Sequence, residues 1–396
     1  MKPLALALLL ASAGVAQTTA TAIPRSDWPE FHRGAEHRGD NRTETALSVT
    51  TVPGMQLLWQ GANGGGIRAS PVVAGAMVYV ASDISGALYA FDAAQGKPVW
   101  SVPNTPARFS TTPAVSNRIL YVGGLDTYLN EAALYALDAK TGKQLWETVL
   151  GVNEGAGMVS SPVVVDGVVY VGSPAGYVNA LDATTGAIIW QSPIWGDGYA
   201  APAVNNGIVY YGAGGFGAQV YAFDASTGQQ IWIADTGYEI YAAPALAYEL
   251  VYVASTDGHL YAFNAATGRL IWKAFYNSAS YSSPAVANGF VYVGSYDNNL
   301  YALNALNGKL VWHQTTGAPI SSSPAVANGV VYVGSADTNL YAFAAATGQL
   351  LWSGSTGQPL LSSPAVSNGM VYVAAGDGAL HAYGLPPRCR SSEIVF

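Results

Sequence analysis

Aromatic and charged side chains stand at fixed distances before a proline that recurs along the chain. Arginine offers a planar set of donors to a carboxylate or phosphate, and tyrosine and tryptophan offer faces for stacking. Aspartate and glutamate bind metal ions or act as bases. Seven of these side chains lie three or five residues before the proline, and an eighth, a tryptophan, lies seven before it. The candidate ligand- or partner-binding residues are Arg68, Arg108, Trp195, Asp197, Tyr199, Glu239, Tyr241 and Tyr281.

Other chemical motifs in the sequence are weak. Residues 212–217 fit Gly-x-Gly-x-x-Gly, but they lie in an expected hairpin with no helix after it, so the context for dinucleotide binding is missing. The five histidines show no metal-ligand spacing, and no metal site is predicted. No Cys-x-x-Cys-His occurs, so no c-type haem is expected. The sequence assigns no catalytic residue.

The recurring proline belongs to a repeat that organises the whole chain. Ser-Pro-Ala-Val at 283–286 returns at 323–326 and 363–366, and looser copies carry Pro71, Pro113, Pro162, Pro202 and Pro244. Val-Tyr-Val or a near variant follows each copy, and a segment like Leu-Tyr-Ala-Phe-Asp-Ala-x-Thr-Gly then leads to a tryptophan. A repeat of about 40 residues with four short β-rich segments is typical of a propeller blade.

The repeat also predicts how the ring closes. In the sixth repeat the expected strands are 284–286, 290–294, 300–303 and 309–312, whereas the eighth repeat stops before its fourth strand. The segment 56–59 matches that missing strand, because Trp59 precedes its proline by 12 residues, as Trp312 does. We therefore predict an all-β fold, an eight-bladed β-propeller of four-stranded antiparallel blades closed by an N-terminal strand. The expected divisions are a signal peptide (1–22), a lead segment (23–55), the propeller (56–384) and a tail (385–396).

The block Ser-Pro-Ala-Val, Val-Tyr-Val-Gly-Ser, Leu-Tyr-Ala-Leu-Asp-Ala-x-Thr-Gly and Trp resembles the pyrroloquinoline quinone (PQQ) repeat. That repeat builds the quinoprotein alcohol dehydrogenases and the propeller lipoprotein of the outer-membrane β-barrel assembly machinery. Asp-Trp-Pro-Glu-Phe at 27–31 also looks like the start of many bacterial PQQ-like repeat proteins, so the resemblance covers about residues 27–384. It implies that the fourth-strand tryptophans dock onto the neighbouring blade: Trp59, Trp100, Trp146, Trp190, Trp232, Trp272, Trp312 and Trp352.

The same resemblance sets out the alternatives for function. In the dehydrogenases PQQ lies at the channel mouth against a disulfide of adjacent cysteines, stacks on a tryptophan and chelates calcium. This chain has a single cysteine, Cys389, and its residues do not match the calcium ligands one by one. We expect a non-catalytic binding or scaffold module that takes a protein or small ligand at the mouth. A PQQ-dependent oxidoreductase with calcium, using Asp197 or Glu239, and an outer-membrane assembly scaffold are the alternatives.

Composition indicates where the protein is located and which partners it does not bind. Half of the 396 residues are hydrophobic and 10% are charged, as expected when both faces of the sheets are buried. The apolar run 3–16 is too short to span a membrane; with Lys2 before it and Ala-Thr-Ala at 20–22 after it, it predicts a secretory signal peptide. The net charge of −8 argues against nucleic acid, and its spread along the chain favours a role in solubility. We expect an exported monomer, periplasmic or extracellular, with no transmembrane segment.

Overall fold

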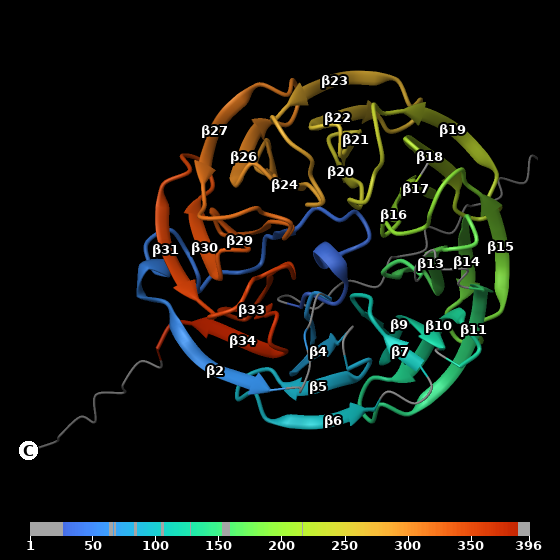
Figure 1. The fold of residues 1–396 in the computed structure, drawn as a ribbon, viewed down its shortest axis with the longest axis horizontal. Coiled ribbons are helices and arrows are strands. Elements are labelled where there is room, and N and C mark those ends of the chain that lie inside the picture. Colours follow the sequence, from blue (N-terminus) through green and yellow to red (C-terminus); the bar gives the residue numbers. More distant parts are fainter. Residues whose placement is uncertain are drawn as a thin grey trace, which may run out of the picture.

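The computed structural model describes residues 27–62, 66, 69–82, 85–103, 107–126, 128–152, 159–215 and 217–386. Eight sheets surround a central axis (Figure 1), and the four blade strands of each are antiparallel, which confirms the predicted eight-bladed propeller. In these ranges the helical elements are two short 3-10 turns, η1 (Phe31–Arg33) and η2 (Val52–Gly54). The expected signal peptide, Arg68 and Cys389 lie outside the described residues.

The blades follow one another around the ring in chain order, each with its first strand innermost (Figure 1). The strands of blades 1 to 4 are β3 (Val72–Ala74), β4 (Met77–Ala81), β5 (Leu88–Asp92) and β6 (Pro98–Val102); β7 (Ala107–Phe109), β8 (Ala114–Ser116), β9 (Ile119–Asp126), β10 (Glu131–Asp138) and β11 (Gln144–Val152); β12 (Val163–Val165), β13 (Val168–Ser173), β14 (Tyr177–Asp182) and β15 (Ile188–Pro193); β16 (Ala203–Asn205), β17 (Ile208–Gly212), β18 (Gln219–Asp224) and β19 (Gln230–Asp235). Those of blades 5 to 8 are β20 (Ala245–Ala247), β21 (Leu250–Ala254), β22 (His259–Asn264) and β23 (Leu270–Phe275); β24 (Ala285–Ala287), β25 (Phe290–Gly294), β26 (Asn299–Asn304) and β27 (Leu310–Thr315); β28 (Ala325–Ala327), β29 (Val330–Gly334), β30 (Asn339–Ala344) and β31 (Leu350–Ser355), with β1 (Asp40–Asn41) on the inner edge; and β32 (Ala365–Ser367), β33 (Met370–Ala374), β34 (Ala379–Gly384) and β2 (Gln56–Ala62).

The strand boundaries follow from the turn residues. In blade 6 the fourth strand begins at Leu310 and runs to Thr315, slightly later and longer than the predicted 309–312. The reason is the preceding turn, in which the Asn304 N–H donates to the Lys309 carbonyl at 2.8 Å and Gly308 adopts a φ of +67°. A glycine takes that left-handed conformation without the steric cost that a Cβ would add.

The N-terminal strand closes the ring as predicted. β2 pairs antiparallel with β34, and Trp59 lies opposite Ala382. Blade 8 is therefore built from both ends of the propeller chain (Figure 1), and β34 has a partner strand on each side. Unpaired sheet edges invite aggregation, so this closure protects the fold.

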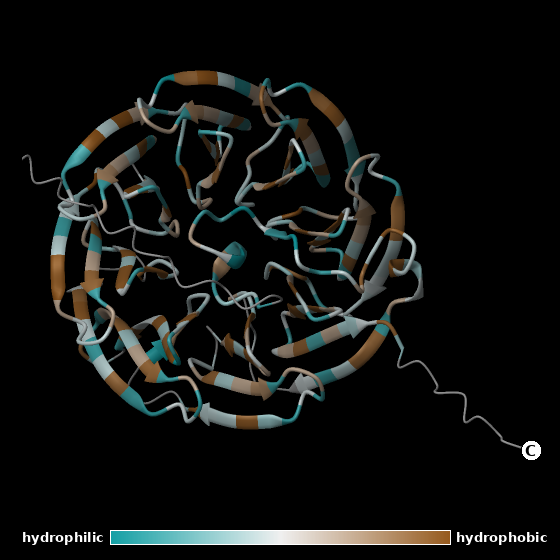
Figure 2. Cartoon of the chain, turned by 180° about the vertical axis from the view of Figure 1, so that it is seen from behind, coloured by the Kyte–Doolittle hydropathy of each residue, from teal (hydrophilic) through white to brown (hydrophobic). Residues whose placement is uncertain are grey.

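Each fourth-strand tryptophan contacts the next blade. The Trp312 indole donates from Nε1 to the Ala345 carbonyl at 3.0 Å, and a Cβ at Gly348 would lie 2.7 Å from the indole ring. The other seven indoles make the same kind of bond at 2.9–3.1 Å, so the contact repeats around the ring. In the outer strand β27 the buried Trp312 lies between exposed residues. Figure 2 shows that hydrophobic and hydrophilic residues both occur along the outer strands.

A second set of blade-to-blade bonds lies near the axis. The residue before the repeat proline donates its backbone N–H to the hydroxyl of the equivalent residue in the next blade, as Ser283 does to Ser323 at 2.9 Å. The same bond joins blade 1 to blade 2, blade 2 to blade 3, blade 5 to blade 6, blade 7 to blade 8 and blade 8 to blade 1. Ala201 and Ala243 occupy this position in blades 4 and 5, so neither can accept the bond that its predecessor would donate.

The two ends of the ring differ. The links from each outer strand to the next inner strand, together with the turns between second and third strands, form what we call the link end. The turns between first and second and between third and fourth strands form the opposite end, which we call the turn end. Because the first strand of every blade starts at the link end, the residues just before the repeat prolines all lie there.

An inner strap, residues 27–47, runs around the axis and contacts every blade in order. Figure 1 shows its turn η1 near the axis, in blue. The strap makes these bonds: Trp28 with Val73 (2.8 and 2.7 Å), the Pro29 carbonyl with Val115 (2.7 Å), the Glu30 carboxyl with Val164 (3.2 Å), the Ala35 carbonyl with Val204 (2.7 Å), Glu36 with Leu246 (2.8 Å), Arg38 with Val286 (2.8 Å), Gly39 with Val326 (2.6 Å) and the Asn41 side chain with Val366 (2.8 Å). The ring is thus closed twice, by β2 outside and by the strap inside.

The strap carries ionisable groups into the protein interior. His32, His37 and Glu30 are all buried. Burial lowers the pKa of His32 to about 4 and that of His37 to about 3, and it raises the pKa of Glu30 to about 8. At neutral pH the two imidazoles are therefore uncharged and the Glu30 carboxyl is mostly protonated, which suits groups removed from water.

Candidate functional site

Four tyrosines form a continuous aromatic ladder on the link end of blades 4 to 6. Ring centroids are 5.8 Å apart between Tyr199 and Tyr241, 5.4 Å between Tyr241 and Tyr281, and 4.9 Å between Tyr281 and Tyr296. Tyr199, Tyr281 and Tyr296 are exposed and Tyr241 is half-buried. The structure thus brings three predicted candidates together.

The repeat explains why these rings meet. The first three tyrosines stand three residues before the repeat proline in successive blades, so the fold places them side by side. The buried Val159 occupies the position in blade 3, and Ser321 occupies it in blade 7, so the ladder is confined to three blades. Tyr296, in the turn between β25 and β26, extends it and was not among the predicted residues.

Two predicted carboxylates lie along the ladder. The Tyr241 hydroxyl donates to Glu239 Oε2 at 3.0 Å, and burial together with this bond raises the pKa of Tyr241 to about 12. The pKa of Tyr199 is also raised, first by burial and then by the charge of Asp197. Backbone bonds of 3.0 and 3.2 Å between Asp197 and Gly214 hold the link that carries Asp197. The ladder thus presents aromatic faces with acidic neighbours.

The remaining candidates are placed differently. Trp195 lies in the same link as Asp197, with its side chain 70% exposed. Its backbone N–H donates to the Tyr221 hydroxyl at 2.9 Å. Arg108 lies in β7, opposite Leu125 of β9, and so belongs to blade 2 and not to the blades of the ladder. The structure therefore brings Tyr199, Tyr241 and Tyr281 together and places Arg108 in another blade.

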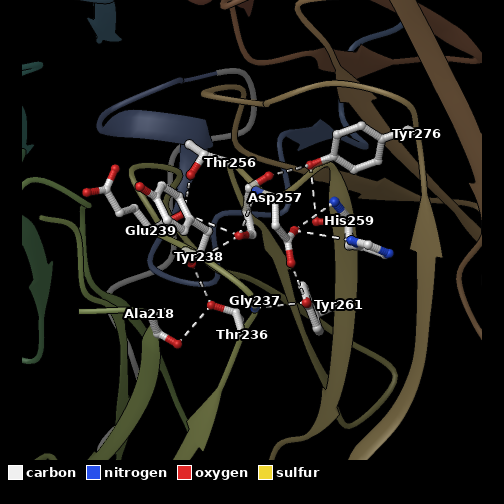
Figure 3. A network of polar contacts seen from close by, with 11 residues as sticks. Ala218, Thr236, Gly237, Tyr238, Glu239, Thr256, Asp257, His259, Tyr261 and Tyr276 are labelled. Carbon is white, nitrogen blue, oxygen red and sulfur yellow. Dashed lines mark hydrogen bonds and ion pairs between the residues drawn. The ribbon is translucent and has the colours of Figure 1, made fainter. Parts of the chain in front are cut away.

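A polar network holds the link that carries Glu239 (Figure 3). The Tyr261 hydroxyl donates to Asp257 Oδ2 at 2.6 Å and accepts the Gly237 N–H at 2.9 Å. The other oxygen, Oδ1, accepts the His259 N–H at 2.9 Å and lies 3.4 Å from the His259 Nδ1. Asp297–Tyr301 and Asp337–Tyr341 repeat the pair at 2.5 and 2.7 Å. Because the pair also occurs in blade 7, which lacks the ladder, its role is to position turns and links.

Folding gathers acidic side chains at the link end, although acidic residues are spread along the sequence. Among the described links and second-to-third-strand turns, Arg108 is the one lysine or arginine. The acidic residues in the same segments are Asp197, Glu239, Asp257, Asp297, Asp337 and Asp377. Most described cations lie instead in the strap and in the turns of the turn end, such as Arg118, Lys140 and Lys309. The link end is therefore the acidic end of the ring.

A cavity of about 1180 Å³ lies at the turn end, where sequence reasoning placed no site. Its walls are the inner strap and the turns of blades 1 to 3, including Arg33, Arg118, Lys140 and Asp166. Glu30, which accepts the Val164 N–H through its side chain, is also among the lining residues. The dense alternation of charges in residues 27–44 is the sequence signal that could have drawn attention to this end.

The donors at the channel mouth do not fit a calcium-bound PQQ. That site needs several oxygen ligands and, by the resemblance, paired cysteines, but the chain has one cysteine. Within the described ranges no group of three or more His, Cys, Asp or Glu side chains is arranged to hold a metal ion. At the ladder, Glu239 already accepts the Tyr241 hydroxyl. We therefore derive no reaction step through PQQ.

The fold, the repeat and the ring closure define a PQQ-like β-propeller. The chain belongs to the PQQ_2 family, described as outer membrane protein assembly factor BamB; the family model matches residues 48–214, 130–236, 216–324 and 301–385. No curated protein sequence is significantly similar to the chain. Across the described residues, no helix combines the length and the hydropathy that crossing a bilayer requires.

Solved structures with different printed names share this fold. The quinohemoprotein alcohol dehydrogenase of Comamonas testosteroni is 17% identical, with a TM-score of 0.77 over 91% of this chain and 80% of its own. BamB of Moraxella catarrhalis is 22% identical, with a TM-score of 0.68 over 83% of this chain and 97% of its own. A europium-containing methanol dehydrogenase is 15% identical, with a TM-score of 0.75 over 91% of this chain and 98% of its own. At these identities the likeness concerns the fold alone.

Proposed function

We propose that the protein is an exported, non-catalytic binding propeller that holds a protein partner on its link end. The tyrosine ladder of Tyr199, Tyr241, Tyr281 and Tyr296 carries this proposal, because it is a continuous exposed aromatic surface at one end of an otherwise regular repeat. Tyrosine is enriched in protein interfaces, where it combines a large apolar face with a polar tip. The family description, an outer-membrane assembly factor, supports a scaffold role.

The regularity of the repeat also favours this surface. Fourth-strand tryptophans and inner hydroxyls bond blade to blade around the ring, so those positions serve the fold. Tyr199, Tyr241 and Tyr281 stand at a position that is not aromatic in the other blades, where it holds Arg68, Ser110, Val159, Ser321 and Leu361. Single exposed apolar residues need no explanation, whereas a contiguous patch marks a contact surface.

The test compares two matched variants in the source cells. Replacing Tyr199, Tyr241 and Tyr281 together by alanine should abolish co-purification of the envelope partner while leaving the circular dichroism spectrum unchanged. The control is Tyr248→Ala at the turn end, where Tyr248 is exposed to a similar degree. Partner recovery that is equal in both variants, or that is lost only with Tyr248→Ala, would overturn the proposal.

The fold shared with dehydrogenases favours one second candidate, a PQQ-dependent oxidoreductase. Adding PQQ and calcium to the purified protein separates the two functions. A non-catalytic propeller shows no stoichiometric change in cofactor absorbance and no alcohol-dependent dye reduction. Saturable PQQ binding with dye reduction would establish the oxidoreductase instead.

A further inference from the structure

The ladder and the charge of the link end together restrict the chemistry of the partner. Aspartate and glutamate are ionised at neutral pH, so the link end carries a negative potential around the exposed rings. Arg108 in blade 2 is the one lysine or arginine in the described links and second-to-third-strand turns. An acidic or strongly anionic partner would be repelled there, because like charges across an interface are unfavourable.

Three of the four ladder rings have a carboxylate nearby. Glu239 lies 3.0 Å from the Tyr241 hydroxyl. Asp197 acts on Tyr199 through its charge, and Asp297 follows Tyr296 directly in the chain. An ammonium or guanidinium group is attracted to the face of an aromatic ring and to a carboxylate beside it. The arrangement therefore has the chemistry of a receptor for cationic side chains.

The length of the ladder favours a chain over a single small cation. Consecutive ring centroids are 4.9–5.8 Å apart over four rings. Alternate side chains on one face of an extended peptide are about 6.6 Å apart, which is a comparable spacing. An extended segment of roughly seven residues would direct four alternate side chains to the four successive rings.

Resting on the proposed function, we infer that the partner presents an extended basic segment, rich in Lys or Arg, to the ladder of blades 4 to 6. The aromatic faces and the methylene stems of Lys or Arg form the apolar part of the contact, and the carboxylates pair with the charged heads. This names the chemistry of the partner and predicts which residues select it.

Three labelled peptides of about ten residues test the inference by fluorescence anisotropy with the mature protein. They share one neutral framework and carry Lys and Arg, Gln, or Glu at every second position. The basic peptide should bind at low ionic strength and weaken as salt is raised toward about 0.3 M, whereas the Gln and Glu peptides should not bind. The double variant Asp197→Asn, Glu239→Gln should bind the basic peptide about 10-fold more weakly.

Matched variants separate the site from general attraction to an acidic protein. Replacing Tyr199, Tyr241 and Tyr281 by phenylalanine should keep most of the affinity, and replacing them by alanine should reduce it at least about 10-fold. Asp166→Asn removes one carboxylate charge at the turn end and should leave binding unchanged. Equal weakening by Asp166→Asn, or unchanged binding by the alanine variant, would overturn the inference.

The proposed function can survive when the inference fails. Ladder-dependent binding of the Gln or Glu peptide would show that the ladder binds a partner of different chemistry, so the basic segment would be wrong and the site right. Binding of none of the three peptides would also reject the basic segment. Co-purification with the alanine variant then decides separately whether the ladder is a binding surface at all.

Discussion

Replacing Trp312 by alanine should destabilise the propeller strongly, because this side chain joins blades 6 and 7. The indole is 8% exposed, and its Nε1 donates to the Ala345 carbonyl at 3.0 Å. That carbonyl also accepts the Tyr292 hydroxyl at 3.0 Å, so it keeps a partner when the indole is removed. The loss is then mainly one of packing, for which large-to-small core changes cost about 3–5 kcal/mol.

The matching change in melting temperature follows from the size of the chain. Unfolding entropy of about 2 cal/mol/K per residue means that such a loss lowers Tm by roughly 4–7 °C in a propeller of this length. Circular dichroism measures it without relying on tryptophan fluorescence. Trp195→Ala is the control; its side chain is 70% exposed, and it should change stability by less than about 0.5 kcal/mol. Equal shifts for both variants would refute the placement of one of them.

A double-mutant cycle sharpens this test. Gly348 has a φ of +73°, and a Cβ there would lie 2.7 Å from the Trp312 ring. Gly348→Ala should be destabilising alone through both strain and steric overlap. Without the indole only the strain remains, so the double variant should cost less than the sum of the single variants. Additive effects would mean that the two residues do not contact each other.

Three further changes test the inner closure. Deleting residues 27–47 while keeping β2 should lower Tm by more than Trp312→Ala does, since it removes bonds to all eight blades; an unchanged Tm would contradict this. The strap histidines, with lowered pKa values of about 4 and 3, are neutral when folded, so stability should fall as pH drops below about 6.5. Glu30 has the opposite pH dependence. Because its pKa is raised to about 8, its contribution to the stability of the fold should fall as pH rises from about 4.5 to 8. Glu30→Gln should therefore remove the decline between about pH 4.5 and 8 in urea-unfolding midpoints; a curve parallel to that of the unaltered protein would contradict it. Ala243→Ser should supply the hydroxyl acceptor missing for the Ala201 N–H and stabilise the fold by about 1 kcal/mol, and a destabilised variant would show that the position lacks room.

The blades were predictable because each repeat states the same local pattern eight times. Turn residues such as Asn304 and Gly308, with alternating apolar positions, specify four strands without long-range information. The closure by β2 was predictable too, because Trp59 keeps its spacing from the next proline. Periodicity therefore carried most of the fold.

The inner strap could not be read from periodicity, because residues 27–47 match no repeat position. Their structure depends on contacts with all eight blades, and that geometry exists only once the ring is formed. The candidate site was partly predictable, because part of it follows the spacing of the repeat. Equal spacing placed Tyr199, Tyr241 and Tyr281 side by side, whereas Tyr296 joins them across a turn that the spacing rule does not cover.

Site-specific photocrosslinking in source cells tests the central claim most directly, that partners bind the link end. A photoreactive amino acid replaces Tyr281 at the link end or Tyr248 at the turn end, which are exposed to similar degrees, 40% and 43%. We expect a discrete crosslinked partner from position 281, and none from position 248. A partner captured from position 248 with none from position 281 would contradict the account.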